Sequence, residues 1–99
     1  DMIKVGAHRI NPLDIEDAIA EMDDVAEVAV VGVPDDILGQ VVRAVVVLRD
    51  GAQVTARQIQ AHCKARLADY KVPKIVDFVT ELPRTASGKI RRFKLTSNE

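Results

Sequence analysis

Four consecutive apolar residues, Val45 to Leu48, lie within the segment VVRAVVVLR, which ends at the turn signal Asp50-Gly51. A strand with one face in water alternates apolar and polar side chains, so an unbroken apolar run indicates a strand that is covered on both faces. Such a strand lies inside a sheet and needs other elements packed above and below it. We therefore expect a layered fold with this segment as its central strand.

The segment NPLDIEDAIAEM has the pattern of an amphipathic helix. Asn11 is a suitable N-cap, and Pro12 suits the first helical position because its missing N–H has no partner there. Ile15, Ile19 and Met22 recur at spacings of four and three, which places them on one apolar face. We predict that this face packs against the sheet.

The segment TARQIQAHCKARLADY predicts a second helix. Thr55 and Gln58 have the spacing of a capping box, in which each side chain bonds a backbone N–H at the helix start. Ile59, Cys63 and Leu67 mark its expected buried stripe. His62 lies between polar neighbours on this helix, and we expect its ring to be solvated.

The remaining segments predict strands and one short final helix. MIKV and HRI flank Gly6-Ala7 and indicate a hairpin. VAEVAVVGV is a β-branched run, which predicts a strand that we expect to end at Pro34. Residues 75–79 predict a further strand, and residues 90–95 predict a short helix. The expected fold class is α+β, with a small mixed sheet, helices packed on it and a preceding N-terminal β-hairpin. All 99 residues suit one domain, and both ends look cut from a longer chain.

Composition limits the cellular setting. Hydrophobic residues make up 47% of the chain and charged residues 29%, which indicates a folded rather than a disordered protein. Cys63 is the single cysteine, so no internal disulfide forms, and a reducing, cytoplasmic location is the natural expectation. We expect no membrane span, because no apolar stretch is long enough.

Charge is divided unevenly along the chain. Residues 1–50 hold 11 acidic and 4 basic residues, whereas residues 51–99 hold 4 acidic and 10 basic residues. A basic half that includes a glycine-bearing loop suggests an anionic small ligand or an anionic partner.

The segment ELPRTASGKIRRFKL carries the clearest chemical signal. Gly88 permits a close backbone approach to a ligand, Ser87 can shape the turn, and Lys89 offers a compact charge on a flexible stem to a phosphate or carboxylate. The glycine and hydroxyl spacing of a nucleotide-binding P-loop is absent. On the residues alone, a solvated basic loop remains an open interpretation. Nucleic-acid binding is disfavoured because no aromatic residues other than Phe93 interleave the basic ones.

LPRTASGKIRR closely resembles the final motif of the adenylate-forming superfamily, which includes the AMP-forming acyl-CoA synthetases. DMIKVGAHRINPLDIEDAI resembles the motif that opens the C-terminal domain of these enzymes, and VVGVPDDILGQVVRAVVVL and LADYKVPKIVDFV match the pattern between the two. The resemblance covers essentially the whole chain in the family's order.

The resemblance implies that residues 1–99 form a mobile C-terminal domain that works with an N-terminal ligase domain. Such ligases join a carboxylate to ATP with Mg²⁺ present, releasing pyrophosphate, and then transfer the acyl group to a thiol, usually that of coenzyme A. Between the two steps the C-terminal domain rotates. The nucleotide and the metal are expected to lie mainly in the N-terminal domain, and no metal site is expected in this chain. Asp1 falls at the hinge region.

The family motifs also assign roles to individual residues. Lys89 matches the lysine that enters the site for adenylation, with Ser87 and Gly88 in its loop. Gly6, Ala7, His8 and Arg9 match the loop that lines the tunnel for the pantetheine arm of coenzyme A.

Several alternatives to these assignments stay open. Ala7 replaces the family's usual second glycine, and Gly6 as an ordinary hairpin glycine remains an alternative. Arg9 is expected to contact phosphate or to bridge the domains, and His8 to pack or lie at the surface. Glu16 is expected to orient the first loop or cap its helix.

A second function class is a binding module that docks an acidic carrier protein or acts with a non-CoA adenylating partner. Five basic residues outside the Lys89 segment would serve such docking. They are Arg57, Lys64, Arg66, Lys71 and Lys74. Lys71 is otherwise expected to have a structural role.

Overall fold

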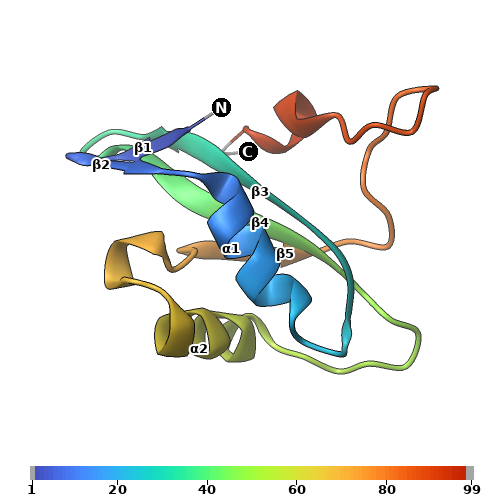
Figure 1. Cartoon of the computed structure of the whole chain (residues 1–99). Helices are drawn as coiled ribbons and strands as arrows, with labels where there is room; N and C mark the ends of the chain where they lie inside the picture. The colour runs from blue at the N-terminus through green and yellow to red at the C-terminus, as the bar shows by residue number, and fades with distance from the viewer. Residues whose placement is uncertain (1, 98–99) are drawn as a thin grey trace.

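The structure, a computed structural model, describes residues 2–97, so the expected hinge position Asp1 lies outside the described residues. The elements follow the predicted order (Figure 1). They are β1 (Ile3–Val5), β2 (His8–Ile10), α1 (Pro12–Ala20), β3 (Val25–Asp35), β4 (Gly39–Leu48), α2 (Ala56–Arg66), the 3₁₀ turn η1 (Asp69–Lys71), β5 (Ile75–Phe78) and the 3₁₀ turn η2 (Arg92–Leu95).

Strand β4 is the centre of the sheet, as its apolar run predicts. β3 lies antiparallel along one side of it, from Val25 opposite Leu48 to Asp35 opposite Gly39. On the other side, β1 meets the start of β4, and β5 runs parallel to its middle. β2 pairs antiparallel with β1. The sheet is therefore mixed, and the N-terminal hairpin is part of it.

Successive residues of β4 supply two separate apolar layers, which explains why the run has no polar member. Val42, Ala44 and Val46 belong to the cluster beneath the two helices. Val45 and Val47 belong to a second cluster on the opposite face, which Leu82, Ile90 and Leu95 cover. Figure 1 shows α1 and α2 on one side of the sheet and the red C-terminal segment on the other.

Both helices begin as their sequences predict. The Asn11 side chain accepts a hydrogen bond from the Leu13 N–H at 3.0 Å, and Thr55 and Gln58 form a complete capping box. The predicted buried positions Ile15, Ile19, Ile59 and Cys63 are fully enclosed. Met22 and Leu67, at the ends of the two stripes, are half-buried.

Three local expectations are wrong. β3 continues through Pro34 to Asp35, because Pro34 lies on an outermost strand where a missing N–H breaks no ladder. α2 ends at Arg66, where Leu67 turns to an extended backbone, and residues 69–71 form a separate 3₁₀ turn. His62 is not solvated, since its Nε2 lies 2.6 Å from the Ala18 carbonyl oxygen of α1.

The final segment does form a short helix, of the 3₁₀ type. Within residues 2–97 no helix has the length and apolar character that crossing a bilayer requires.

Candidate functional site

Lys89 lies on a tight loop between two short paired segments. Arg84 and Ile90 form an antiparallel bridge, and the Thr85 N–H donates to the Lys89 carbonyl oxygen at 2.8 Å. Gly88 has a φ of 91°, a conformation that L-residues other than glycine rarely adopt. The backbone conformation of this turn thus favours glycine at position 88, as the sequence predicts.

Hydroxyl groups hold the inside of this loop. The Thr85 Oγ1 accepts a hydrogen bond from the Lys89 N–H at 3.2 Å and lies 2.9 Å from the Ser87 Oγ. The Lys89 side chain is exposed, and its ammonium has no hydrogen bond or ion pair with any residue that the structure describes. The side chain is therefore free to meet an anion supplied from outside this chain.

The arginines of the segment are engaged, unlike Lys89. Arg84 forms an ion pair with Glu27 of β3 and donates to the Gly88 carbonyl oxygen at 2.8 Å. The Arg91 guanidinium lies over the Phe93 ring, 5.0 Å from its centroid. A solvated basic loop does not describe these arginines, because Arg84 fastens the segment to β3 and Arg91 packs on Phe93 within the segment.

The N-terminal hairpin turns on Gly6 and Ala7. Gly6 has a φ of 59°, and Ala7 does not have a positive φ, a combination that corresponds to a type II′ turn. The Gly6 N–H donates to the Leu38 carbonyl oxygen at 2.8 Å, which ties the turn to the β3–β4 connection. Ala7 thus fits the turn without backbone strain.

The hairpin turn forms one wall of a pocket of about 380 Å³. The His8 ring stacks on Tyr70 of η1, with centroids 3.7 Å apart and an angle of 9° between the planes. His8 therefore packs, as predicted. Arg9 is exposed and does not line this pocket. The lining residues include Gly6, Ala7, His8, Tyr70, Val72 and Lys74.

The two candidate loops lie far apart. Figure 1 shows the β1–β2 turn at one end of the molecule and the orange-red loop after β5 at the opposite end. The structure therefore brings Gly6, Ala7 and His8 together in one place and Ser87, Gly88 and Lys89 in another. Neither set makes a complete catalytic site by itself.

The five basic residues considered for carrier docking divide into two groups. Arg66 pairs with Glu21 at 2.6 Å, and Lys71 pairs with Asp14 at 3.2 Å, so Lys71 has the expected structural role. The other three line an open groove of about 570 Å³ between α2 and η1. They are Arg57, Lys64 and Lys74.

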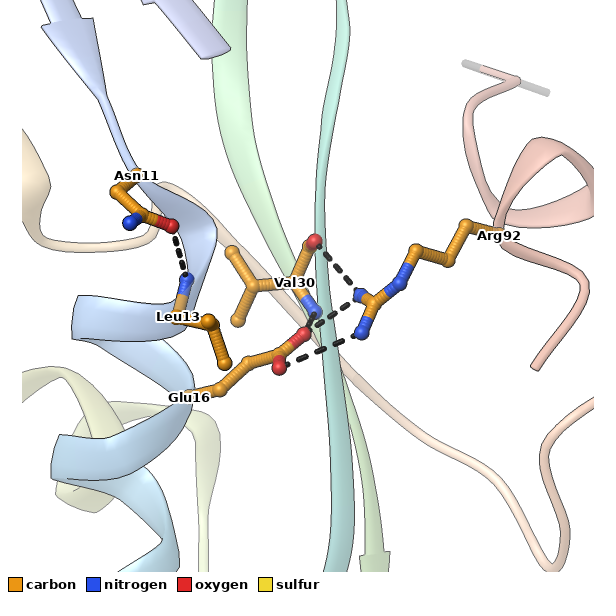
Figure 2. Close-up of polar contacts among 5 residues, drawn as sticks. All are labelled: Asn11, Leu13, Glu16, Val30 and Arg92. Atoms are coloured by element: carbon orange, nitrogen blue, oxygen red, sulfur yellow. Dashed lines mark hydrogen bonds and ion pairs between the residues drawn. The ribbon is translucent and has the colours of Figure 1, made fainter. Parts of the chain in front are cut away.

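One polar network was missed by sequence reasoning. Glu16 neither orients the hairpin loop nor caps α1; its carboxylate accepts hydrogen bonds from the Val30 N–H and from Arg92 (Figure 2). The available signal was the position of Glu16 beside Ile15 and Ile19 on a helix that packs on a sheet. A carboxylate at such a position needs a buried partner.

Other reactive groups are protected or dispersed. Burial raises the pKa of the Cys63 thiol to about 11, and the nearby positive charge of Arg66 only partly opposes this shift. Across residues 2–97, no group of three or more His, Cys, Asp or Glu side chains could hold a metal ion.

The order of elements and the mixed sheet agree with the fold expected for a C-terminal domain of the adenylate-forming class. The family described as "AMP-binding enzyme C-terminal domain" matches residues 14–89, and this chain belongs to that family. The predicted resemblance and fold class are therefore confirmed.

Relatives and solved structures agree with this assignment. The chain is 46% identical to 4-hydroxybutyrate–CoA ligase 1 of Metallosphaera sedula and 43% identical to the long-chain-fatty-acid–CoA ligase of Bacillus subtilis, in each case over 100% of this chain and 18% of the relative. The acyl-CoA synthetase of Brucella canis superposes with a TM-score of 0.90 at 42% identity, over 97% of this chain and 18% of that one.

The amide bond synthetase McbA of Marinactinospora thermotolerans superposes with a TM-score of 0.94 at 36% identity, over 99% of this chain and 20% of that one. This chain thus spans about a fifth of the length of the proteins that it matches.

Proposed function

We propose that this chain is the mobile C-terminal domain of a longer AMP-forming acyl-CoA ligase, in which Lys89 assists adenylation. The observation that carries the proposal is an exposed ammonium without a partner in the described residues, on a loop that is fastened at its base. The ligase names of the relatives support the reaction class. ATP and Mg²⁺ would be held mainly by the N-terminal domain, which would be this chain's principal partner.

The chemistry of the first step explains the need for a lysine. A carboxylate oxygen attacks the α-phosphorus of ATP, the bond to the β-phosphate oxygen breaks, and pyrophosphate leaves with its electron pair. Negative charge grows on the non-bridging and leaving oxygens, and the Lys89 ammonium would stabilise it. A positioned donor of this kind typically contributes about 2.7–4 kcal/mol, or about 10²–10³ in rate.

In the second step the hairpin pocket would guide the thiol. The sulfur attacks the acyl carbon, its proton passes to solvent or a base, the bond to the AMP oxygen breaks and AMP leaves. Gly6 and Ala7 present little side-chain bulk along the pocket wall, which suits the narrow pantetheine arm of coenzyme A. Arg9, outside the pocket, would instead face a phosphate or the other domain.

The decisive experiment separates the two half-reactions in the full-length ligase that contains this chain. Lys89→Ala should slow adenylation, measured as pyrophosphate release, about 10²–10³-fold. It should leave thioester formation from supplied acyl-adenylate within about threefold. Lys94→Ala is the matched control, because Lys94 is also an exposed lysine of the same segment, and its ammonium has no hydrogen bond or ion pair in residues 2–97. Equal loss in both half-reactions, or in neither, would contradict the proposal.

The pocket has a test of its own. Ala7→Leu should hinder thioester formation from supplied adenylate while pyrophosphate release continues, because the added bulk enters the pocket wall. An Ala7→Gly variant, which only removes a methyl group, should retain both activities. Unimpaired thioester formation by Ala7→Leu would rule out this pocket as the thiol route.

The acyl substrate is not set by this domain. The relatives named for 4-hydroxybutyrate and for long-chain fatty acids match the chain at 46% and 43% identity, so the likeness favours neither substrate. The cytoplasmic location stays a prediction from the single cysteine.

Docking of an acidic carrier is a second candidate, favoured by three cations of the α2–η1 groove that have no ion pair within residues 2–97. Arg57, Lys64 and Lys74 line it together, whereas Arg66 and Lys71 are neutralised by acidic neighbours. Carrier binding through this groove should weaken steeply between 50 and 300 mM salt, on the order of the screening expected for exposed charges. Binding indifferent to salt would count against it.

A further inference from the structure

The most enclosed carboxylate among the ion pairs of residues 2–97 belongs to Glu16. Its side chain is 12% exposed, on a helix face that packs against the sheet. The Oε2 atom accepts a hydrogen bond from the Val30 N–H at 2.8 Å and from the Arg92 Nη1 at 2.6 Å, and the Oε1 atom lies 3.4 Å from the Arg92 Nη2. Removing either charged partner would leave the other without its counter-ion.

Arg92 also forms a hydrogen bond with the backbone at the outer edge of β3. Its Nη1 donates to the Val30 carbonyl oxygen at 3.3 Å. Figure 2 shows the guanidinium of Arg92 and the carboxylate of Glu16 meeting at the peptide edge of Val30 from opposite sides. Both polar groups of Val30 are thus bonded by side chains where a further strand would otherwise pair. This arrangement joins α1, β3 and η2.

The same strand holds the other end of the Lys89 loop. Arg84, five residues before Lys89, pairs with Glu27 of β3. Arg92, three residues after Lys89, pairs with Glu16 against β3. Between these points the backbone of the loop is bonded to itself, and only its tip projects. The base of the loop therefore has a fixed place relative to the sheet, while the lysine side chain stays free.

We propose that the Glu16–Arg92 pair is a positioning device for Lys89, a role that rests on the function proposed for that lysine. Neither residue would touch the nucleotide. The pair would hold the base of the loop so that the ammonium arrives at the α-phosphate within the narrow tolerance that catalysis requires. A misplacement of about 1 Å can lower a rate about 10²-fold, and supporting contacts are what prevent it.

The first test measures both half-reactions in the full-length ligase. Arg92→Ala should lower kcat of adenylation about 10–100-fold with little change in the KM for ATP. Thioester formation from supplied adenylate should stay within about threefold. Arg91→Ala is the matched control, because Arg91 is the adjacent arginine and contacts Phe93 rather than Glu16. Equal loss in both half-reactions would indicate a purely structural role and overturn the proposal.

A double variant separates this proposal from the proposed function. If Arg92 acts through Lys89, Arg92→Ala should add little further loss in a Lys89→Ala background. An unchanged further loss of 10–100-fold would overturn the positioning role. If Lys89→Ala alone has no effect on adenylation, that result contradicts the function proposed for Lys89 rather than the positioning role by itself.

Glu16→Gln provides a milder variant in case Arg92→Ala does not fold. Its amide oxygen can still accept from the Val30 N–H while the charged pair with Arg92 is lost. We expect a smaller loss than for Arg92→Ala, again confined to adenylation, with unchanged circular dichroism. In the 99-residue chain, ¹⁵N relaxation should show faster motion of residues 85–89 in this variant. Wild-type relaxation together with wild-type adenylation would overturn the proposal.

Discussion

The imidazole of His8 and the phenol ring of Tyr70 lie face to face, although 62 positions separate them in the chain. Their centroids are 3.7 Å apart, and their planes differ by 9°. This contact fastens the tip of the N-terminal hairpin to η1, on the rim of the pocket that we assign to the thiol arm. The two walls of that pocket are therefore coupled.

Replacing Tyr70 should weaken this coupling. Tyr70→Leu should lower the free energy of unfolding by about 1 kcal/mol, because aromatic pairs contribute about 0.5–1.5 kcal/mol beyond their area. Urea denaturation of the 99-residue chain measures the loss. Tyr70→Phe keeps the ring and should unfold like the wild type; a Phe variant as weak as the Leu variant would mean that the stacked ring is not the source of stability.

Gly6→Ala should destabilise the chain through its backbone rather than through a clash. Gly6 has a φ of 59°, and an added Cβ would lie 3.7 Å from Leu38 Cδ2, an ordinary contact. The positive-φ conformation at this position of a type II′ turn costs an L-residue about 1–3 kcal/mol. Thermal unfolding should show a lower Tm for Gly6→Ala. A comparable loss in Ala7→Gly, whose φ is not positive in the wild type, would argue against this explanation.

Thr55→Ala should remove the capping box at the start of α2. The Thr55 Oγ1 accepts from the Gln58 N–H at 3.1 Å, and the Gln58 side chain accepts from the Thr55 N–H at 2.8 Å. Loss of such a cap costs about 0.5–2 kcal/mol, which urea titration resolves. Thr55→Ser retains the hydroxyl and should restore most of this stability; a Ser variant as unstable as the Ala variant would exclude the hydrogen bond as the cause.

Cys63 should be inert in the folded chain. Burial raises its pKa to about 11, so at pH 8 about 0.1% of the thiol is thiolate, and the thiolate becomes abundant only as the pH approaches 11. Ellman's reagent at pH 8 should detect no thiol in the native protein and one thiol per chain in 6 M guanidinium chloride. Rapid stoichiometric labelling of the native protein would contradict this expectation.

Local patterns predicted the elements, whereas the resemblance to a family supplied the roles of the candidate site residues, which stay predictions. The run from Val45 to Leu48 identified the central strand because alternate residues must enter two apolar layers. The cap residues Asn11 and Thr55 bond as their positions require. These features depend on neighbours within a few residues, which a sequence displays directly.

Features that depend on distant partners were not predicted. Arg92 meets Glu16 across 76 positions, and no short pattern specifies such a contact. The polar neighbours of His62 in the sequence predict a solvated ring, whereas the carbonyl oxygen that the ring meets belongs to α1. Local sequence predicts a strand end at Pro34, but the tolerance of a strand for proline depends on whether that strand is outermost, which is a property of the assembled sheet.

The side-chain hydrogen bonds at the outer edge of Val30 affect how readily concentrated copies of this chain associate. An outermost strand with free amide and carbonyl groups is a template on which another chain can add and start a fibre. Glu16 and Arg92 occupy those groups near the middle of β3, and Pro34 offers no donor near its end. The contact that links three parts of the fold therefore also discourages neighbouring copies from joining edge to edge.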